Sequence, residues 1–230
     1  MIIGGLQKTT LVDYPGKVSC AVFLSGCNFS CPYCHNPDLA KGSAPESVHK
    51  DDLLEFLDHR RGLIDGVVIS GGEPTLHPEL LCLCRDVRHM GYAVKLDTNG
   101  SRPEVIDRLL QAKVLDYVAM DIKTDEKGYA THFMPHGHPD RILKSIHLLR
   151  RSSVSCEFRT TCVHPFVSRS IIEQISIMIE GADRYVLQRF RPETVLNPAF
   201  FQRRKAQIGE SELTAYQRIA EGRIQQCIIR

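Results

Sequence analysis

Short apolar segments rich in β-branched residues alternate along the chain with segments whose apolar residues recur at helical spacing. This alternation is typical of a parallel sheet of buried strands covered by amphipathic helices. Proline residues mark some of the expected helix starts, as at Pro78 and Pro103. Six strands are predicted, at residues 18–25, 66–71, 93–98, 116–123, 155–163 and 184–190.

Six β/α units are too few for a closed eight-stranded barrel. We therefore predict an α/β fold, a partial (β/α)6 TIM-like barrel, with functional residues at the carboxyl ends of its strands. One domain is expected over residues 1–230, with a core of about 15–190 and a C-terminal extension over 191–230. Helices are predicted after residues 43–47, over 78–91, from 103, over 141–150, over 168–181 and within the tail from 211 to 230.

The composition adds limits on function. The 230 residues are 43% hydrophobic and 24% charged, with a net charge of +2, so a folded core is expected. That charge gives no electrostatic reason to propose nucleic acid or an anionic membrane as a partner. The first 17 residues lack the apolar segment of a signal peptide, and no stretch approaches the roughly 20 apolar residues of a transmembrane helix. We expect a soluble, cytoplasmic protein.

Nine cysteines are many for such a chain. Their odd number and the missing secretion signal favour reduced thiols, some of them for a metal, over a disulfide framework. Three cluster in "SGCNFSCPYCHNPDL", residues 25–39. The scattered cysteines are expected to be ordinary packing residues, at or near the core: Cys20, Cys82, Cys84, Cys156, Cys162 and Cys227.

The clustered cysteines are Cys27, Cys31 and Cys34. A structural zinc site normally has four ligands, and His35 is poorly spaced to be the fourth because it directly follows Cys34. A [4Fe–4S] cluster also normally takes four thiolates, so three would leave one iron open to another ligand. For these residues alone, zinc or a structural role stays open.

Polar and glycine-rich segments follow several predicted strands: "SGGEP" at residues 70–74, "LDTNG" at 96–100 and "AMDIK" at 119–123. Glycines allow a close approach of the backbone to a ligand, and Glu73 could accept hydrogen bonds from an ammonium group. Arg159, in the fifth strand, could bind a carboxylate. With the aromatic ring of Tyr33, these groups predict a pocket for an adenosyl compound that carries an amino acid.

The stretch "VDYPGK" (residues 12–17), followed by "GCNFSCPYCHNPD" (26–38) and the strand-end motifs, resembles the radical S-adenosylmethionine (radical SAM) enzymes. Within them it resembles the family that activates glycyl-radical enzymes such as pyruvate formate-lyase. The resemblance extends from residue 10 to about 190. It implies a [4Fe–4S] cluster on the three cysteines, with SAM on its fourth iron. In this family the reduced cluster cleaves SAM, and the 5′-deoxyadenosyl radical removes a hydrogen atom.

The resemblance also implies the residues that contact SAM. Tyr33 and Asn36 would lie against its adenosine or methionine part, Gly71, Gly72 and Glu73 would receive its ammonium group, and Lys123 and Arg159 would bind its carboxylate. Asp97 and Asp121, with backbone carbonyls near Thr98 and Ala119, would hold a monovalent cation beside that carboxylate, as in some members.

One segment departs from the family. A histidine often follows the sixth strand, whereas here the sequence is "VLQRFRP" (residues 186–192), and Gln188 is the candidate for that contact. This version is similar to the subgroup that activates anaerobic ribonucleoside-triphosphate reductase. The implied partners are a glycyl-radical enzyme as protein substrate and a flavodoxin or ferredoxin type electron donor.

Other interpretations remain. Asp97 and Asp121 could cap turns or helices, Lys123 could be a solvated strand end, and Arg159 could form a structural ion pair. The histidines at 132, 136 and 138 are expected in a surface loop rather than in a second metal site. The chain could instead be a radical SAM enzyme acting on a small molecule, as in 7-deazaguanine biosynthesis, or a metal-binding module without activity.

Overall fold

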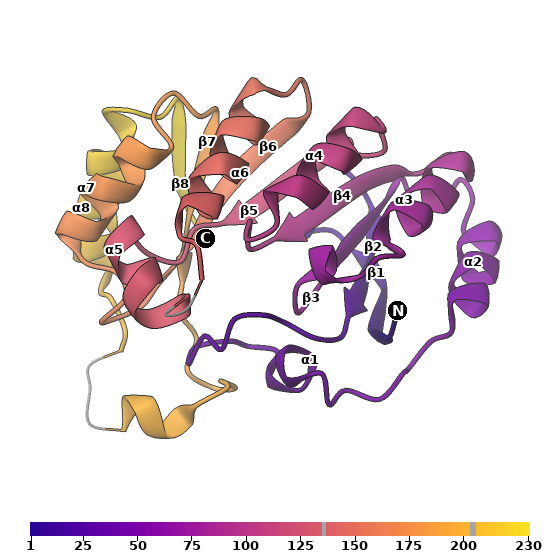
Figure 1. Ribbon diagram of the computed structural model, residues 1–230, viewed down its shortest axis with the longest axis horizontal. Helices are drawn as coiled ribbons and strands as arrows, with labels where there is room; N and C mark the ends of the chain where they lie inside the picture. Colours follow the sequence, from indigo (N-terminus) through magenta and orange to yellow (C-terminus); the bar gives the residue numbers. More distant parts are fainter. Residues whose placement is uncertain (135–136, 203–205) are drawn as a thin grey trace.

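The computed structural model describes residues 1–134, 137–202 and 206–230. Its strands form one sheet in sequence order from β1 to β8, and the six predicted parallel strands are all present (Figure 1). Their bounds are β2 (Ser19–Leu24), β3 (Gly66–Gly71), β4 (Ala93–Thr98), β5 (Tyr117–Asp121), β6 (Ser155–Cys162) and β7 (Arg184–Arg189).

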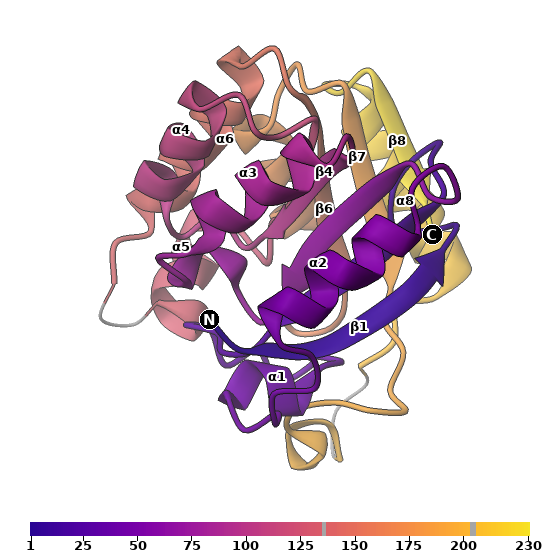
Figure 2. The same ribbon diagram turned by 90° about the vertical axis from the view of Figure 1, so that its right-hand side faces the viewer.

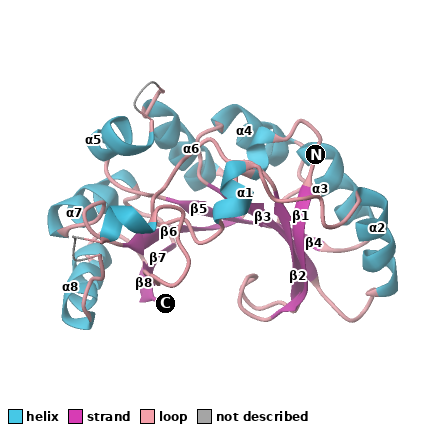
Figure 3. Ribbon diagram, turned by 90° about the horizontal axis from the view of Figure 1, so that it is seen from below, coloured by secondary structure: helices cyan, strands magenta, loops and turns pink. Residues whose placement is uncertain are grey.

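The main helices follow the strands in turn and cover the outer, convex face of the curved sheet (Figure 3). They are α2 (Lys50–His59), α3 (Leu80–His89), α4 (Pro103–Gln111), α6 (Asp140–Arg151), α7 (Arg169–Met178) and α8 (Glu210–Glu221). Shorter helical segments lie in the loops: α1 (Pro37–Lys41), the 3-10 turns η1 (Pro74–Leu76) and η3 (Pro198–Phe201), α5 (Glu126–Gly128) and the π-helix η2 (Tyr129–Phe133).

Two strands at the edges of the sheet were not predicted. β1 (Ile3–Thr10) pairs antiparallel with β2, and β8 (Gln226–Ile229) pairs parallel with β7. Figure 2 shows β1 and α2 side by side at one edge of the molecule. Edge strands are exposed on one side and need no continuous apolar run, so the period that marks the inner strands is weak here. The six parallel strands with these two edges confirm the partial barrel.

The core lies between the sheet and its helices, and the other face of the sheet carries charged side chains beside a second, small apolar cluster. In β4, Val94 and Leu96 are fully buried among the apolar core residues, whereas the intervening Lys95 and Asp97 take part in ion pairs. Successive side chains of a strand point to opposite faces, so this alternation separates the core from the functional face. In β4 the same alternation therefore places apolar side chains in the core and charged side chains on the concave face.

None of the helices in the described part of the chain is long and apolar enough to cross a membrane. All nine cysteines are free thiols. Cys20, Cys84 and Cys162 are buried, which confirms them as packing residues. Cys82 is exposed, so its expected core position is wrong: it lies two residues before Cys84 on α3, and residues two apart on a helix do not share a face.

Candidate functional site

A cavity of about 260 Å³ lies at the carboxyl ends of the parallel strands. Residues that follow or end β2, β3, β4, β5, β6 and β7 all contribute to its wall. It is lined by every predicted site residue except Glu73: Cys27, Cys31, Tyr33, Cys34, Asn36, Gly71, Gly72, Asp97, Asp121, Lys123, Arg159 and Gln188. Segments far apart in the sequence thus form one site, as the strand-end motifs predict.

The three cysteines lie in a loop with both buried and exposed residues: Cys31 is buried, and Cys27 and Cys34 are partly exposed. The backbone N–H of Phe29 donates to Cys27 Sγ at 3.4 Å, and the side-chain amide of Asn99 lies 3.9 Å from the same sulfur. Burial raises the pKa of Cys27 to about 11 and that of Cys31 to about 12. Both are therefore neutral thiols in the protein alone, and a metal would displace their protons on binding.

The cysteines are not arranged around a single ion. Among the described residues, no three His, Cys, Asp or Glu side chains converge closely enough to hold one metal ion. His35, next to Cys34, instead places Nε2 2.8 Å from the backbone oxygen of Arg191. The three thiols share one cavity, and cysteine thiolates are the usual ligands of an iron–sulfur cluster.

The glycines after β3 serve backbone packing. Gly71 has φ +126°, and a Cβ there would lie 2.2 Å from the backbone oxygen of Leu24. At Gly72 a Cβ would lie 2.1 Å from the oxygen of Gly26. The sequence predicts that these glycines let a ligand approach the backbone, and both do line the cavity. They also let the backbone at the end of β3 lie against the backbone that leaves β2. Only glycine allows the cysteine loop to leave β2 at this distance.

Glu73 lies behind the cavity wall and is fully buried. Its carboxylate accepts hydrogen bonds from the backbone N–H of Thr75 at 3.1 Å, the hydroxyl of Thr98 at 2.7 Å and the backbone N–H of Asn99 at 2.6 Å. Burial raises its pKa, and these hydrogen bonds oppose that shift. Both carboxylate oxygens are engaged, so Glu73 joins the segment after β3 to the end of β4.

Opposite charges meet on the wall formed by β4, β5 and β6. Arg159 donates through Nε to Asp121 at 2.7 Å and through Nη1 to Asp97 at 3.2 Å. Lys123 binds the other oxygen of Asp121 at 2.9 Å, and Lys95 binds Asp97. Three cations contact two carboxylates here, and the buried carboxylate of Glu157 also attracts Arg159.

The pKa shifts agree with this geometry. Burial would raise the pKa of Asp121, but attraction to Arg159 and Lys123 outweighs burial and holds it below the ordinary value. Burial would also raise the pKa of Asp97, but attraction to Arg159 and Lys95 outweighs burial and lowers this pKa. Burial would lower the pKa of Lys123, yet Asp121 raises it above its ordinary range. All these groups are charged at neutral pH. The alternative that Lys123 is a solvated strand end is wrong, because its side chain is only 14% exposed.

The hydroxyl of Tyr33 is a buried polar atom without a partner among the described residues. Its ring packs against Phe133 and Phe166, and the residue lines the cavity. A buried hydroxyl without a hydrogen bond is costly, so a polar ligand in the cavity would satisfy it. Together with the cysteines and the charged side chains of Lys123 and Arg159, it describes a site for a polar ligand that carries charge.

Some residues in the cavity wall, or bound to a wall residue as Lys95 is to Asp97, escaped the sequence prediction. Lys95 is 1% exposed and lies in a mostly apolar strand. Only its position between Val94 and Leu96 indicates that its side chain points to the opposite face of the sheet from theirs. Asn99 also lines the cavity, and its place in "LDTNG" directly after the predicted Asp97 could have indicated it. Ser70 donates to Asp97 at 3.3 Å from the end of β3.

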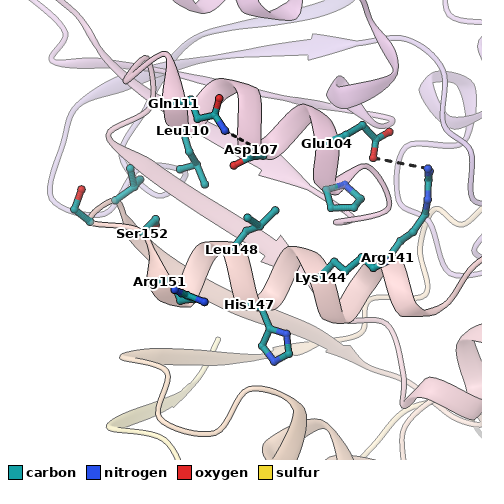
Figure 4. Close-up of a pocket in the computed structure, with 13 residues that line it drawn as sticks. Glu104, Asp107, Leu110, Gln111, Arg141, Lys144, His147, Leu148, Arg151 and Ser152 are labelled. Atoms are coloured by element: carbon teal, nitrogen blue, oxygen red, sulfur yellow. Dashed lines mark hydrogen bonds and ion pairs between the residues drawn. The ribbon is translucent and has the colours of Figure 1, made fainter.

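The other candidates lie elsewhere. His132 and His138 are exposed, and His132 belongs to η2, where its ring meets Phe166 edge-on; His136 lies outside the described residues. A larger cavity of about 830 Å³ lies between α4 and α6 (Figure 4). Its wall carries acidic residues on α4, such as Glu104, and basic ones on α6, such as Arg141, but no cysteine. It is separate from the strand-end site.

Comparisons with known proteins agree with the geometry. Residues 22–175 match the family model of the radical SAM superfamily. A protein of Methanocaldococcus jannaschii, whose name places it among glycyl-radical enzyme activating enzymes, is 34% identical over the whole chain and 95% of its own length. The pyruvate formate-lyase-activating enzyme of Clostridium pasteurianum is 35% identical, but the match covers only 55% of each protein.

The fold is also similar to a solved structure. Streptococcus suis SuiB bound to its precursor peptide SuiA superposes with a TM-score of 0.68 over 91% of this chain and 48% of that one. The two sequences are 15% identical, so this similarity concerns the fold alone.

Proposed function

This chain belongs to the radical SAM superfamily and, within it, to the glycyl-radical enzyme activating family, and from that premise we propose that it generates a glycyl radical on a partner enzyme. The [4Fe–4S] cluster would be held by Cys27, Cys31 and Cys34. One observation carries the proposal: these three thiols share a single cavity with the cationic side chains of Lys123 and Arg159.

The donor set fits the two cofactors that the family implies. Three soft thiolates suit iron–sulfur ligation, and no tetrahedral single-ion site competes in the described residues. The ammonium group of Lys123 and the guanidinium group of Arg159 suit the carboxylate of SAM. The unpartnered hydroxyl of Tyr33 and the amides of Asn36 and Gln188, which also line the cavity, can take its polar atoms.

When bound, the cluster and SAM supply the one-electron chemistry of the reaction. The contributions of the chain are binding and orientation. Arg159 and Lys123 fix the methionine end of SAM, Tyr33 and Asn36 lie beside the cysteines, and the glycines after β3 bring the cysteine loop against the strand ends. The hydrogen atom removed from a backbone glycine of the partner would end on 5′-deoxyadenosine, and the partner would carry the glycyl radical.

The finer assignments are proposed on narrower grounds. Anaerobic ribonucleoside-triphosphate reductase is the proposed partner, supported by the sequence of residues 186–192 and by Gln188 in the cavity wall. A flavodoxin or ferredoxin type donor would supply the electron. A monovalent cation at Asp97 and Asp121 would have to share carboxylates that already bind Lys95, Lys123 and Arg159.

Electron paramagnetic resonance tests the proposal. The reconstituted protein is mixed anaerobically with SAM, a reductant and either the reductase or pyruvate formate-lyase, and each partner is also used with its radical glycine replaced by alanine. We expect a glycyl doublet with the wild-type reductase only. A doublet with pyruvate formate-lyase alone would overturn the partner. No doublet with either, together with 5′-deoxyadenosine formed on a small substrate, would overturn the activase function.

A further inference from the structure

We propose that residues 190–202, called the strap from here on, are a positioning segment that holds the cysteine loop in the shape needed to retain its cluster. The strap follows β7 and lies beside the loop, more than 150 residues away in sequence, as the contact of His35 with Arg191 illustrates. In Figure 1 the loop after β2 crosses the lower side of the molecule and meets this later segment. The inference rests on the proposed cluster site.

The first contact is between backbones. The N–H of Leu196 donates to the oxygen of Cys34 at 3.0 Å, and the N–H of Asn197 donates to the oxygen of Pro32 at 3.0 Å. These two carbonyls belong to the C-x2-C part of the motif. Their orientation sets the backbone from which the thiols of Cys31 and Cys34 project, so the strap fixes the loop at its ligands.

The loop has little backbone support of its own. Within residues 28–35, the described part of the structure gives one internal backbone hydrogen bond, from the Cys34 N–H to the Cys31 oxygen at 3.0 Å. The same residues contain no helix or strand. A segment with few internal hydrogen bonds opens easily. Among the described residues, the two bonds from the strap therefore supply most of the backbone hydrogen bonds of this stretch, beside the packing of the Phe29 and Tyr33 rings against other aromatic residues.

His35 provides the second contact. Its Nε2 lies 2.8 Å from the Arg191 oxygen, and its ring stacks on Phe190 with the ring centroids 6.0 Å apart. His35 is exposed, and this contact with the start of the strap holds its ring beside Cys34. It acts on the cluster through the loop and is a positioning residue.

Aromatic packing provides the third contact, at the far end of the strap. Phe200 stacks on Phe166 with the centroids 5.5 Å apart, and Phe166 packs on Tyr33, which lies between Cys31 and Cys34, at 5.4 Å. Phe201 packs on Phe190 at 5.3 Å, which joins the two ends of the strap. The loop is thus held at three successive positions.

The loss of cluster iron to a chelator tests this role. Wild-type protein with its cluster is compared with Leu196→Pro, which lacks the N–H that binds Cys34. Thr194→Pro is the matched control, because its N–H makes no backbone hydrogen bond among the described residues. We expect Leu196→Pro to release iron roughly three to ten times faster, the factor expected for one hydrogen bond. Thr194→Pro should release iron at the wild-type rate.

Three substitutions at His35, which remove its contacts stepwise, keep the test valid if the proline variant fails to fold. His35→Phe keeps the stacking, His35→Gln keeps a hydrogen-bond donor, and His35→Ala keeps neither. Iron release should be fastest for alanine and intermediate for the other two, while urea unfolding of the cluster-free proteins stays unchanged. A purely structural role would instead lower the unfolding stability of all three in step with iron loss.

The outcomes separate the two proposals. Cluster-loaded Leu196→Pro and His35→Ala that release iron at the wild-type rate would overturn the role of the strap and leave the proposed function intact. A wild-type protein that takes up no iron and sulfide on anaerobic reconstitution would overturn the proposed cluster itself.

Discussion

Arg159 on β6 donates through Nε to the carboxylate of Asp121 on the neighbouring strand β5, at 2.7 Å. The same guanidinium reaches Asp97 on β4 through Nη1 at 3.2 Å. One planar side chain thus joins the ends of three strands on the wall of the cavity. Lysine has a single charged group and cannot form this fork.

Replacing Arg159 by Met should therefore weaken both SAM binding and the fold. It leaves two partly buried carboxylates with fewer cations, and the cost of breaking a buried ion pair, about 3–5 kcal/mol, is the upper bound for this loss. Arg159→Lys should restore only part of the loss. The exposed pair Arg169–Glu173 gives the control, since Arg169→Met should cost less than about 1 kcal/mol. Urea unfolding and anaerobic equilibrium dialysis with SAM measure the effects. Full rescue by lysine would contradict the fork.

The same group predicts an acid sensitivity. The pKa of Asp121 and of Asp97 is lowered below the ordinary 3.8, so the stability they contribute is complete above that value. It is lost as the pH falls below about 4 towards the lowered pKa values. Unfolding measured by urea at pH 5 and at pH 3 should show a smaller loss for Asp121→Asn than for the wild type. Equal losses would show that these carboxylates do not control the acid response.

Gly72→Ala should displace the cysteine loop. The added Cβ would lie 2.1 Å from the Gly26 oxygen and 3.1 Å from the Cys27 nitrogen, so backbone must move. We expect about 1–3 kcal/mol less stability, the range for overpacking, and less iron per chain after reconstitution. Gly209→Ala is the control, because a Cβ at Gly209 meets nothing within 4 Å. Normal iron content in Gly72→Ala would show that the contact does not set the loop position.

Asn99 should influence the cluster potential. Its Oδ1 accepts the Ser101 N–H at 2.9 Å, which directs its Nδ2 towards Asn28 and Cys27 Sγ. Hydrogen bonds to the sulfurs favour the more negative, reduced cluster. Asn99→Leu should therefore shift the midpoint potential to more negative values in a redox titration. Ser101→Ala, which keeps this donor, should leave it in place. An unchanged potential in Asn99→Leu would exclude the effect.

The apolar pattern predicted the inner strands well because each is buried on the helix side of the sheet. β3 and β4 have the predicted bounds, and only the half-exposed β1 and β8 were missed. The site residues were recognisable because parallel strands bring their carboxyl ends together, so motifs far apart in sequence share one cavity.

Other features needed the three-dimensional contacts. The carboxylate of Glu73 follows a strand like those of Asp97 and Asp121, yet its hydrogen bonds turn it away from the cavity. Cys82 and Cys84 look alike in the sequence, but only Cys84 is buried. The contact of the strap with the cysteine loop joins segments that no local pattern relates.

Iron content and SAM cleavage together test the central claim most directly. The protein is reconstituted anaerobically, reduced and mixed with SAM, beside Cys34→Ser and the exposed-cysteine control Cys82→Ser. With the proposed cluster in place, we expect a brown protein with about four irons per chain that forms 5′-deoxyadenosine only when reduced. Cys82→Ser should behave like the wild type, and Cys34→Ser should form none. A colourless protein that binds zinc and leaves SAM intact would contradict the proposed [4Fe–4S] cluster and the cleavage of SAM.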